Sequence, residues 1–221
     1  KWRVNYIGAP SLNNINSEKF LDKKIFFKKY NLDFNKDIFL VNFNSESINF
    51  EKTEKQIKTL FNVLIKFKEK NILVTKTNFD TYSNIINNHI TNIKKKYTFV
   101  KLVSYLGEDY NSAMKYSKIM IGNSSSGIIE AASFKLPVVN IGIRQKGRAF
   151  AKNIINSDFN EVDILKAIKI AYSNRFKKKI QKIVNPYENK RFEKNLNMIM
   201  NKISKLNKNQ LIVKKFIDQK I

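Results

Sequence analysis

Residues 119–130 read IMIGNSSSGIIE. Three apolar residues end at Gly122, small and polar residues follow as far as Gly127, and an apolar helical pattern then begins. This order is typical of a buried parallel strand that turns tightly into a helix. Small residues let a ligand approach the backbone, and a helix start adds N–H donors and partial positive charge. The stretch therefore predicts an α/β fold with an anion site at the carboxyl end of this strand.

Further apolar runs alternate with helical patterns along the chain, spaced roughly 20–35 residues apart as right-handed crossovers require. The runs predict strands at 38–43, 72–75, 99–103, 118–121 and 137–141. The patterns between them predict helices from Thr53, from about Asp80-Thr81, and over 110–116 and 127–134. We therefore expect a Rossmann-like, doubly wound parallel sheet.

Two features of the predicted helices are specific enough to check. Thr53 with Gln56 three residues later predicts a capping box at the start of the first long helix. That helix has an apolar face made of Ile57, Leu60, Phe61, Leu64 and Ile65. The only histidine, His89, lies among isoleucines on the next helix, so we interpret it as a packing or surface residue.

The flanks of this core differ from it. Residues 1–37 predict a short strand over 4–7, a turn at 8–10 and a helix over 20–30, and we interpret them as a hinge segment. Residues 38–185 form the predicted nucleotide-binding domain. Residues 186–221 follow a break at Asn185-Pro186 as a helical segment, with a lysine-rich helix over 192–217. The chain begins at Lys1 rather than methionine, so we expect preceding residues in the same protein.

The net charge of +24 comes from 42 Lys and Arg against 18 Asp and Glu. Such a balance suits nucleic acid, anionic membranes or phosphorylated ligands, but it is also what an AT-biased coding sequence gives. The lysines are spread along the whole chain, so we favour the second explanation and expect neither nucleic acid nor membrane as partner. The absence of cysteine excludes disulfides, thiolate catalysis and cysteine-ligated zinc, which fits a reducing cytoplasm. With a single histidine, a histidine-rich metal site or a Ser/His triad is hard to build within this chain.

Two groups after the glycine-serine loop can contact a nucleotide. Glu130 lies one turn into the helix and can accept hydrogen bonds from ribose hydroxyls, although a carboxylate there also compensates the helix dipole. The loop Arg144-Gln145-Lys146-Gly147-Arg148 carries three cations in five residues directly after a strand. It is either an ordinary basic loop or a clamp on phosphate oxygens.

Residues 122–130, 137–142 and 144–148 together resemble the hydrolysing UDP-N-acetylglucosamine 2-epimerases, a family that includes enzymes of sialic and legionaminic acid synthesis. The resemblance extends to 75–81, 185–187 and 8–10, and so covers roughly residues 4–200. It implies one half of a glycosyltransferase-B-like fold, namely its second, UDP-binding domain. The first, catalytic domain would lie outside this chain and carry the contacts of a homo-oligomer.

The resemblance also implies roles for individual residues. Those at the UDP site would be Ser124, Ser125, Ser126, Gly127, Glu130, Arg144, Arg148, Ser104 and Tyr110. The family reaction removes the C2 proton of a UDP-sugar, eliminates UDP and hydrates the resulting glycal to the C2 epimer. It uses no metal and no redox cofactor, and its acid and base groups would come from the first domain.

One departure from the family pattern affects the chemistry. Where the family carries a histidine after the first strand, this chain has Asn44, followed by Ser45 and Glu46. Asparagine donates a hydrogen bond but does not titrate near neutral pH. Three explanations are open: the chemistry tolerates the change, Glu46 compensates for it, or the parent protein is impaired.

Two rival functions stay open on the sequence alone. A glycosyltransferase of the same architecture would use a similar donor domain, although the 144–148 loop favours the epimerase. A basic nucleic-acid-binding module would instead show tight and strongly salt-dependent binding to RNA or DNA.

Overall fold

The computed structural model of the chain describes residues 4–13, 15, 20–46, 50–77 and 82–212. Six parallel strands form one sheet in the order β3-β2-β1-β4-β5-β6. Their bounds are β1 Ile38–Asn42, β2 Asn71–Thr75, β3 Val100–Val103, β4 Ser117–Gly122, β5 Val138–Ile141 and β6 Ile154–Ser157. From β1 the chain adds strands on one side of the sheet as far as β3, and from β4 it adds them on the other side. This reversal between β1 and β4 confirms the predicted doubly wound sheet.

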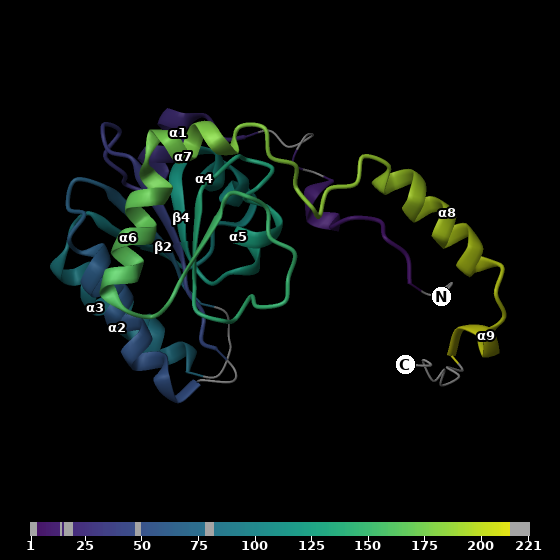
Figure 1. Cartoon of the computed structure of the whole chain (residues 1–221), viewed down its shortest axis with the longest axis horizontal. Coiled ribbons are helices and arrows are strands. Elements are labelled where there is room, and N and C mark those ends of the chain that lie inside the picture. Colours follow the sequence, from purple (N-terminus) through teal and green to yellow (C-terminus); the bar gives the residue numbers. More distant parts are fainter. Residues whose placement is uncertain (1–3, 14, 16–19, 47–49, 78–81, 213–221) are drawn as a thin grey trace.

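Helices cover both faces of the sheet (Figure 1). Side chains alternate along a strand, so Phe39 and Val41 of β1 join one core cluster while Ile38 and Leu40 join the other. The first cluster is closed by α2 Thr53–Leu64, α3 Ser83–Lys96 and α6 Glu161–Tyr172. The second cluster is closed by α1 Lys23–Lys29, α4 Tyr110–Tyr116 and the turns after α5 Ser125–Ile129. Both faces of every central strand are therefore buried, which explains their uninterrupted apolar sequences.

The chain leaves this three-layer unit after α7 Asn174–Ile180 and continues into α8 Phe192–Ser204 and α9 Lys208–Ile212. In Figure 1 α8 and α9 project away from the sheet, beside the N-terminal segment that leads into the short 3-10 helix η1 Pro10–Leu12. The two segments are joined by hydrogen bonds, from Ala9 N–H to the Tyr187 carbonyl at 2.8 Å and from Asn13 Nδ2 to Glu193 Oε1 at 3.2 Å. We call residues 4–13 and 185–193 the crossing segments, because they run together along the edge of the domain, and we call 185–193 the returning segment.

Several predicted elements need correction. The edge strand β6 was not predicted, because it is short, only partly buried and has two apolar residues. Residues 4–7 are not a strand; Tyr6 Oη instead donates to the Pro186 carbonyl at 3.0 Å. Helix α5 ends at Ile129 rather than at 134, because the chain turns there toward β5 and Asn185 Nδ2 donates to the Ile129 carbonyl at 2.7 Å.

The predicted capping box is wrong. Helix α2 follows the 3-10 turn η2 Phe50–Lys52, so Lys52 occupies the N-cap position and Thr53 is already helical. Thr53 is fully buried and its hydroxyl has no hydrogen-bond partner. Gln56 points to Glu46 instead, with 3.2 Å between Nε2 and Oε2. The helix starts because of packing, not because of a cap.

The remaining helix predictions are largely confirmed. The start predicted near Asp80-Thr81 lies outside the described residues, and α3 continues from Ser83. His89 on α3 packs edge-on against Phe61, with 5.8 Å between ring centroids, and burial lowers its pKa. It is therefore a neutral packing residue. The predicted 192–217 helix is interrupted between α8 and α9, and no described helix is long and apolar enough to cross a membrane.

Candidate functional site

The carboxyl ends of β1, β4 and β5 lie side by side, and the loops that follow them form the candidate site. In the register of the sheet, Gly122 is paired with Asn42 on one side and with Asn140 on the other. The loops after these strands carry Asn44, the serine residues and Arg144. Since β1 and β4 flank the point where the strand order reverses, this is where open α/β sheets bind ligands.

Gly122 is required at the end of β4. Its φ is +136°, and a Cβ there would lie 1.9 Å from the carbonyl oxygen of Asn42. Only glycine allows β4 to approach β1 this closely and then turn. The turn places the next residue, Asn123, beneath the loop of β1 with no exposed surface.

Asn123 joins the two loops through reciprocal hydrogen bonds. Its Oδ1 accepts from the Asn44 backbone N–H at 2.8 Å, and its Nδ2 donates to the Asn44 carbonyl at 2.8 Å. The Asn44 side chain in turn accepts from Thr77 Oγ1, after β2, at 2.8 Å. Asn44 is thus held at the switch point, between the loops of β2 and β4.

The serine loop forms a chain of hydroxyl contacts. Ser124 Oγ lies 2.9 Å from Ser126 Oγ, and Ser126 Oγ lies 2.6 Å from Tyr110 Oη of α4. Tyr110 Oη also contacts Oδ1 of Asn42, at 3.4 Å. Burial raises the pKa of Tyr110, so the phenol stays protonated at neutral pH. Tyr110 therefore supports the serine loop from below.

Glu46 ties the basic loop to the end of β1. This carboxylate is buried, and its Oε1 accepts from the backbone N–H groups of Ile143 at 2.7 Å and Arg144 at 3.2 Å. Gly142 has φ +77°, and a Cβ there would lie 2.3 Å from Glu46 Oε1. Arg144 Nη1 then donates to the Asn123 carbonyl at 3.2 Å, so the guanidinium lies over the glycine-serine loop.

Glu130 lies just past the end of α5 and is partly buried. Ser11 Oγ, from the N-terminal segment, donates to its Oε1 at 2.6 Å, while Oε2 is buried without a hydrogen-bond partner. Burial raises the pKa of Glu130, whereas Ser11 and the positive charge of Arg148 lower it. A buried carboxylate oxygen without a donor is costly, so this atom is suited to accept from a ligand hydroxyl.

The structure brings most of the other predicted residues to the same edge. Ser125 is the first residue of α5, and Gly127 is buried against Val138. Arg148 is exposed but close enough for its charge to act on Glu130. Ser104 is the exception: it is exposed just after β3, which β2 and β1 separate from β4.

The sequence matches the family model described as UDP-N-acetylglucosamine 2-epimerase over residues 1–201. The chain belongs to this family. It is 40% identical over 163 residues to a GDP/UDP-N,N'-diacetylbacillosamine 2-epimerase (hydrolyzing) of Campylobacter jejuni, a match that covers 73% of this chain and 42% of the relative. A UDP-N,N'-diacetylbacillosamine 2-epimerase (hydrolyzing) of Legionella pneumophila is 31% identical over 176 residues, 76% of this chain and 46% of the relative. The chain thus spans less than half the length of these relatives.

Solved structures agree on the fold of this epimerase-family chain. A co-structure of S. aureus MnaA with UDP has a TM-score of 0.68 at 16% identity and covers 90% of this chain and 53% of that one. A Neisseria meningitidis UDP-GlcNAc 2-epimerase bound to UDP-GlcNAc has a TM-score of 0.64 at 14% identity, covering 83% and 49%. Both support the assignment of this chain to one half of a glycosyltransferase-B-like fold.

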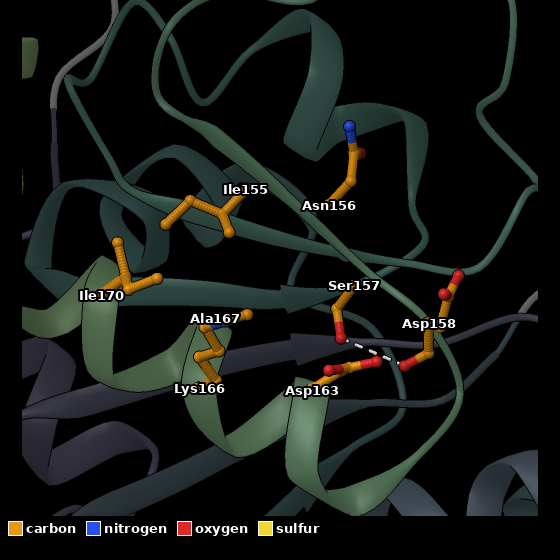
Figure 2. Close-up of a pocket in the computed structure, with 8 residues that line it drawn as sticks. All are labelled: Ile155, Asn156, Ser157, Asp158, Asp163, Lys166, Ala167 and Ile170. Carbon is orange, nitrogen blue, oxygen red and sulfur yellow. Dashed lines mark hydrogen bonds between the residues drawn. The ribbon is translucent and has the colours of Figure 1, made fainter.

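A separate hollow of this epimerase-family domain lies between β6 and α6 (Figure 2). It has a volume of about 250 Å³, and its polar lining includes Ser157, Asp158, Asp163 and Lys166. Figure 2 shows Ser157, Asp158 and Asp163 near one another, with a hydrogen bond from Ser157 Oγ to the Asp158 carbonyl at 3.1 Å. None of the predicted UDP-site residues lines it. Among the described residues there is also no group of three or more His, Asp or Glu side chains that could hold a metal ion.

Sequence reasoning missed three contributors to the edge. Asn42 and Asn123 join β1 to β4, and Ser11 contacts Glu130 across 119 positions of sequence. Asn42 had a signal, because it ends an otherwise apolar strand, and a buried side-chain amide is expected to have hydrogen-bond partners. Ser11 had none, since only the fold brings the N-terminal segment back to α5.

Proposed function

We propose that this chain is the UDP-binding half of a hydrolysing 2-epimerase that acts on a UDP-N-acetyl sugar, either UDP-N-acetylglucosamine or a UDP-diacetamido sugar. The two relatives named for diacetylbacillosamine favour the second of these substrates. The observation that carries the proposal is the convergence of the serine loop, Arg144 and a partnerless Glu130 oxygen at one switch point.

Each group has a distinct proposed role toward UDP. Ser124, Ser125 and the backbone to Gly127 bind the diphosphate with hydroxyl and N–H donors. Arg144 adds positive charge beside them, and Arg148 supplements it from the exposed end of its loop. Glu130 accepts from the ribose hydroxyls. The α4 region around Tyr110 faces the uracil side in this proposal, and so does Ser104, although it lies after β3 and away from the switch point.

The proposed contribution to catalysis is stabilisation of the leaving group. Eliminating UDP from the sugar leaves negative charge on the diphosphate, and fixed donors with an adjacent guanidinium lower the cost of that charge. Asn44 supplies amide hydrogen bonds at the sugar-facing loop but carries no titrating proton. The proton transfers at C2 are therefore assigned to groups outside this chain.

The proposed domain organisation follows from this separation between nucleotide binding in this chain and proton transfer outside it. Residues 1–37 connect to a first, catalytic domain, 38–185 bind the nucleotide, and 186–221 return toward that first domain. The paired crossing of 4–13 and 185–193 supports a hinge at this position. We propose that the complete enzyme is a homo-oligomer assembled through the first domain and that it serves synthesis of sialic-acid-type sugars.

Calorimetric titration of the chain with UDP tests the proposal. We expect saturable 1:1 binding, weakened about tenfold by Glu130→Ala and about tenfold by Arg144→Ala, because each removes one charge-assisted contact. Arg175→Ala is the control for charge, since Arg175 is exposed on α7, near the amino ends of the strands. It should leave UDP affinity unchanged.

A parallel titration with UMP and a short RNA, at low and high salt, separates this function from nucleic-acid binding. UDP binding that tolerates salt better than RNA binding supports a nucleotide site, because counterion release dominates only with the polymer. RNA binding without UDP binding would overturn the proposal in favour of a basic nucleic-acid module.

A further inference from the structure

Ser11, in the described part of the N-terminal segment, reaches the candidate site with its side chain. Its hydroxyl donates to Oε1 of Glu130 at 2.6 Å, although the two residues are 119 positions apart. Ser11 itself is exposed, so this contact is not a by-product of core burial. The hydroxyl occupies one oxygen of the carboxylate and leaves the other, Oε2, buried and without a partner.

The backbone around Ser11 is fixed from both sides. Leu12 is buried, and Ala9 N–H donates to the Tyr187 carbonyl at 2.8 Å. Gly8, at φ +89°, has no room for a Cβ, which would lie 2.9 Å from Cβ of Asn189. The helix η1 that carries Ser11 is thus held against the returning segment, and these contacts fix the direction of the Ser11 hydroxyl.

The returning segment is also hydrogen-bonded to α5, just before Glu130. Asn185 is buried, and its Nδ2 donates to the Ile129 carbonyl at 2.7 Å and to Ser133 Oγ at 2.8 Å. Both crossing segments therefore meet α5 within a few residues of Glu130. Through the hydrogen bond between Ser11 and the Glu130 carboxylate, the crossing segments contact the candidate site directly.

We propose that Ser11 is a positioning residue for UDP: its hydrogen bond fixes the orientation of the Glu130 carboxylate, so that Oε2 accepts from a ribose hydroxyl. This rests on the proposed function, because it assumes that Glu130 faces the ribose. It makes the nucleotide affinity depend on where the N-terminal crossing segment lies.

The electrostatics agree with this geometry. Burial raises the pKa of Glu130, the Ser11 hydrogen bond lowers it, and the charge of Arg148 lowers it further. Tyr110 is the other titratable group coupled to this carboxylate, and it stays protonated because burial raises its pKa. Without Ser11 the pKa of Glu130 rises further, so the carboxylate of the variant becomes neutral at a higher pH than that of the wild type. A neutral carboxyl accepts hydrogen bonds less strongly.

Titrations of the full chain with UDP and with 2′,3′-dideoxy-UDP, at pH 8, 7 and 6, test the inference. We expect Ser11→Ala to weaken UDP binding about fivefold at pH 7, the loss of roughly one hydrogen bond. The ratio of variant to wild-type dissociation constant should grow toward pH 6, and taking this ratio cancels the protonation of UDP itself. Dideoxy-UDP lacks both ribose hydroxyls, so its affinity should change little.

Two variants separate positioning from simple structural support. Ser11→Thr keeps the hydroxyl and should restore wild-type affinity at every pH. Asn13→Ala removes a comparable hydrogen bond of the same segment, to Glu193, without touching Glu130, and should leave UDP affinity unchanged. If wild type binds UDP but Ser11→Ala matches Asn13→Ala at all three pH values, the role of Ser11 is overturned and the proposed function stands. If wild type does not bind UDP, both fail.

Discussion

Gly122 is the residue on which the geometry of the candidate site depends most directly. The carbonyl oxygen of Asn42 occupies the place where its side chain would begin, 1.9 Å from an ideal Cβ. That oxygen belongs to β1 and accepts from the Asn123 backbone N–H at 3.1 Å, so it cannot move aside without breaking the contact between β1 and β4. We expect Gly122→Ala to lower the free energy of unfolding by about 3 kcal/mol or more. Urea denaturation measures it.

Gly147 provides the matched control for this prediction. It also has a left-handed backbone, φ +88°, but a Cβ there meets nothing within 4 Å. Gly147→Ala should therefore cost only the backbone strain, about 1–2 kcal/mol. Equal losses for the two variants would show that strain alone, rather than contact with β1, makes Gly122 necessary.

The start of α2 shows how packing replaces a predicted local signal at the scale of an element. Thr53 has the sequence context of an N-cap, yet the structure buries it one position inside the helix with an unpartnered hydroxyl. Thr53→Val keeps the shape and removes that hydroxyl. We expect the free energy of unfolding to stay constant or to rise by up to about 1 kcal/mol. A true N-cap would lose about 1 kcal/mol on this change, and a loss of that size in urea denaturation would contradict the structure.

Most of the strands that the sequence predicts correctly are buried along most of their length, and β3, which is only partly buried, is the exception. Strands β1, β2, β4 and β5 are buried on both faces, so their apolar runs are unambiguous. The edge strand β6 is half-exposed, and its short polar sequence carries no such pattern. Its position is set by pairing with β5, which is a property of the assembled sheet.

Some residues of the candidate site can likewise be predicted from the sequence, whereas others cannot. Ser124 and Arg144 lie in loops that directly follow strands, and Glu130 comes at the end of the short helix α5 that follows the first of these loops. Their shared edge can therefore be predicted from strand order alone. Ser11 and Glu46 enter the site through side-chain contacts across 119 and 97 positions of sequence. Nothing local in the sequence specifies these contacts, because they depend on how the crossing segments and the loop of β1 are finally placed.

At the scale of the whole molecule, the described chain consists of a packed three-layer unit and a projecting helical end (Figure 1). None of the residues of α8, all of which the structure describes, is buried. Its apolar positions Met198 and Met200 are 63% and 56% exposed, so they add nothing to the core of the domain. The returning segment before α8 differs, because Asn185 and Tyr187 are hydrogen-bonded into the domain.

Removing residues 191–221 should therefore leave the domain intact. This truncation removes the exposed hydrogen bond from Asn13 to Glu193 and the partly buried side chain of Phe192, which lines a hollow with Ala9 and Leu12. We expect the melting temperature to change by less than about 2 °C and UDP affinity to stay the same. Asn185→Ala, within the truncated chain, should instead cost about 2 kcal/mol, since it removes two partly buried hydrogen bonds, to Ile129 of α5 and to Ser133 in the turn after it. Calorimetry on both proteins measures the contrast. If truncation costs as much as Asn185→Ala, α8 belongs to the same cooperative unit and the boundary near residue 186 is wrong; if it does not, the nucleotide-binding domain ends where the returning segment releases α5.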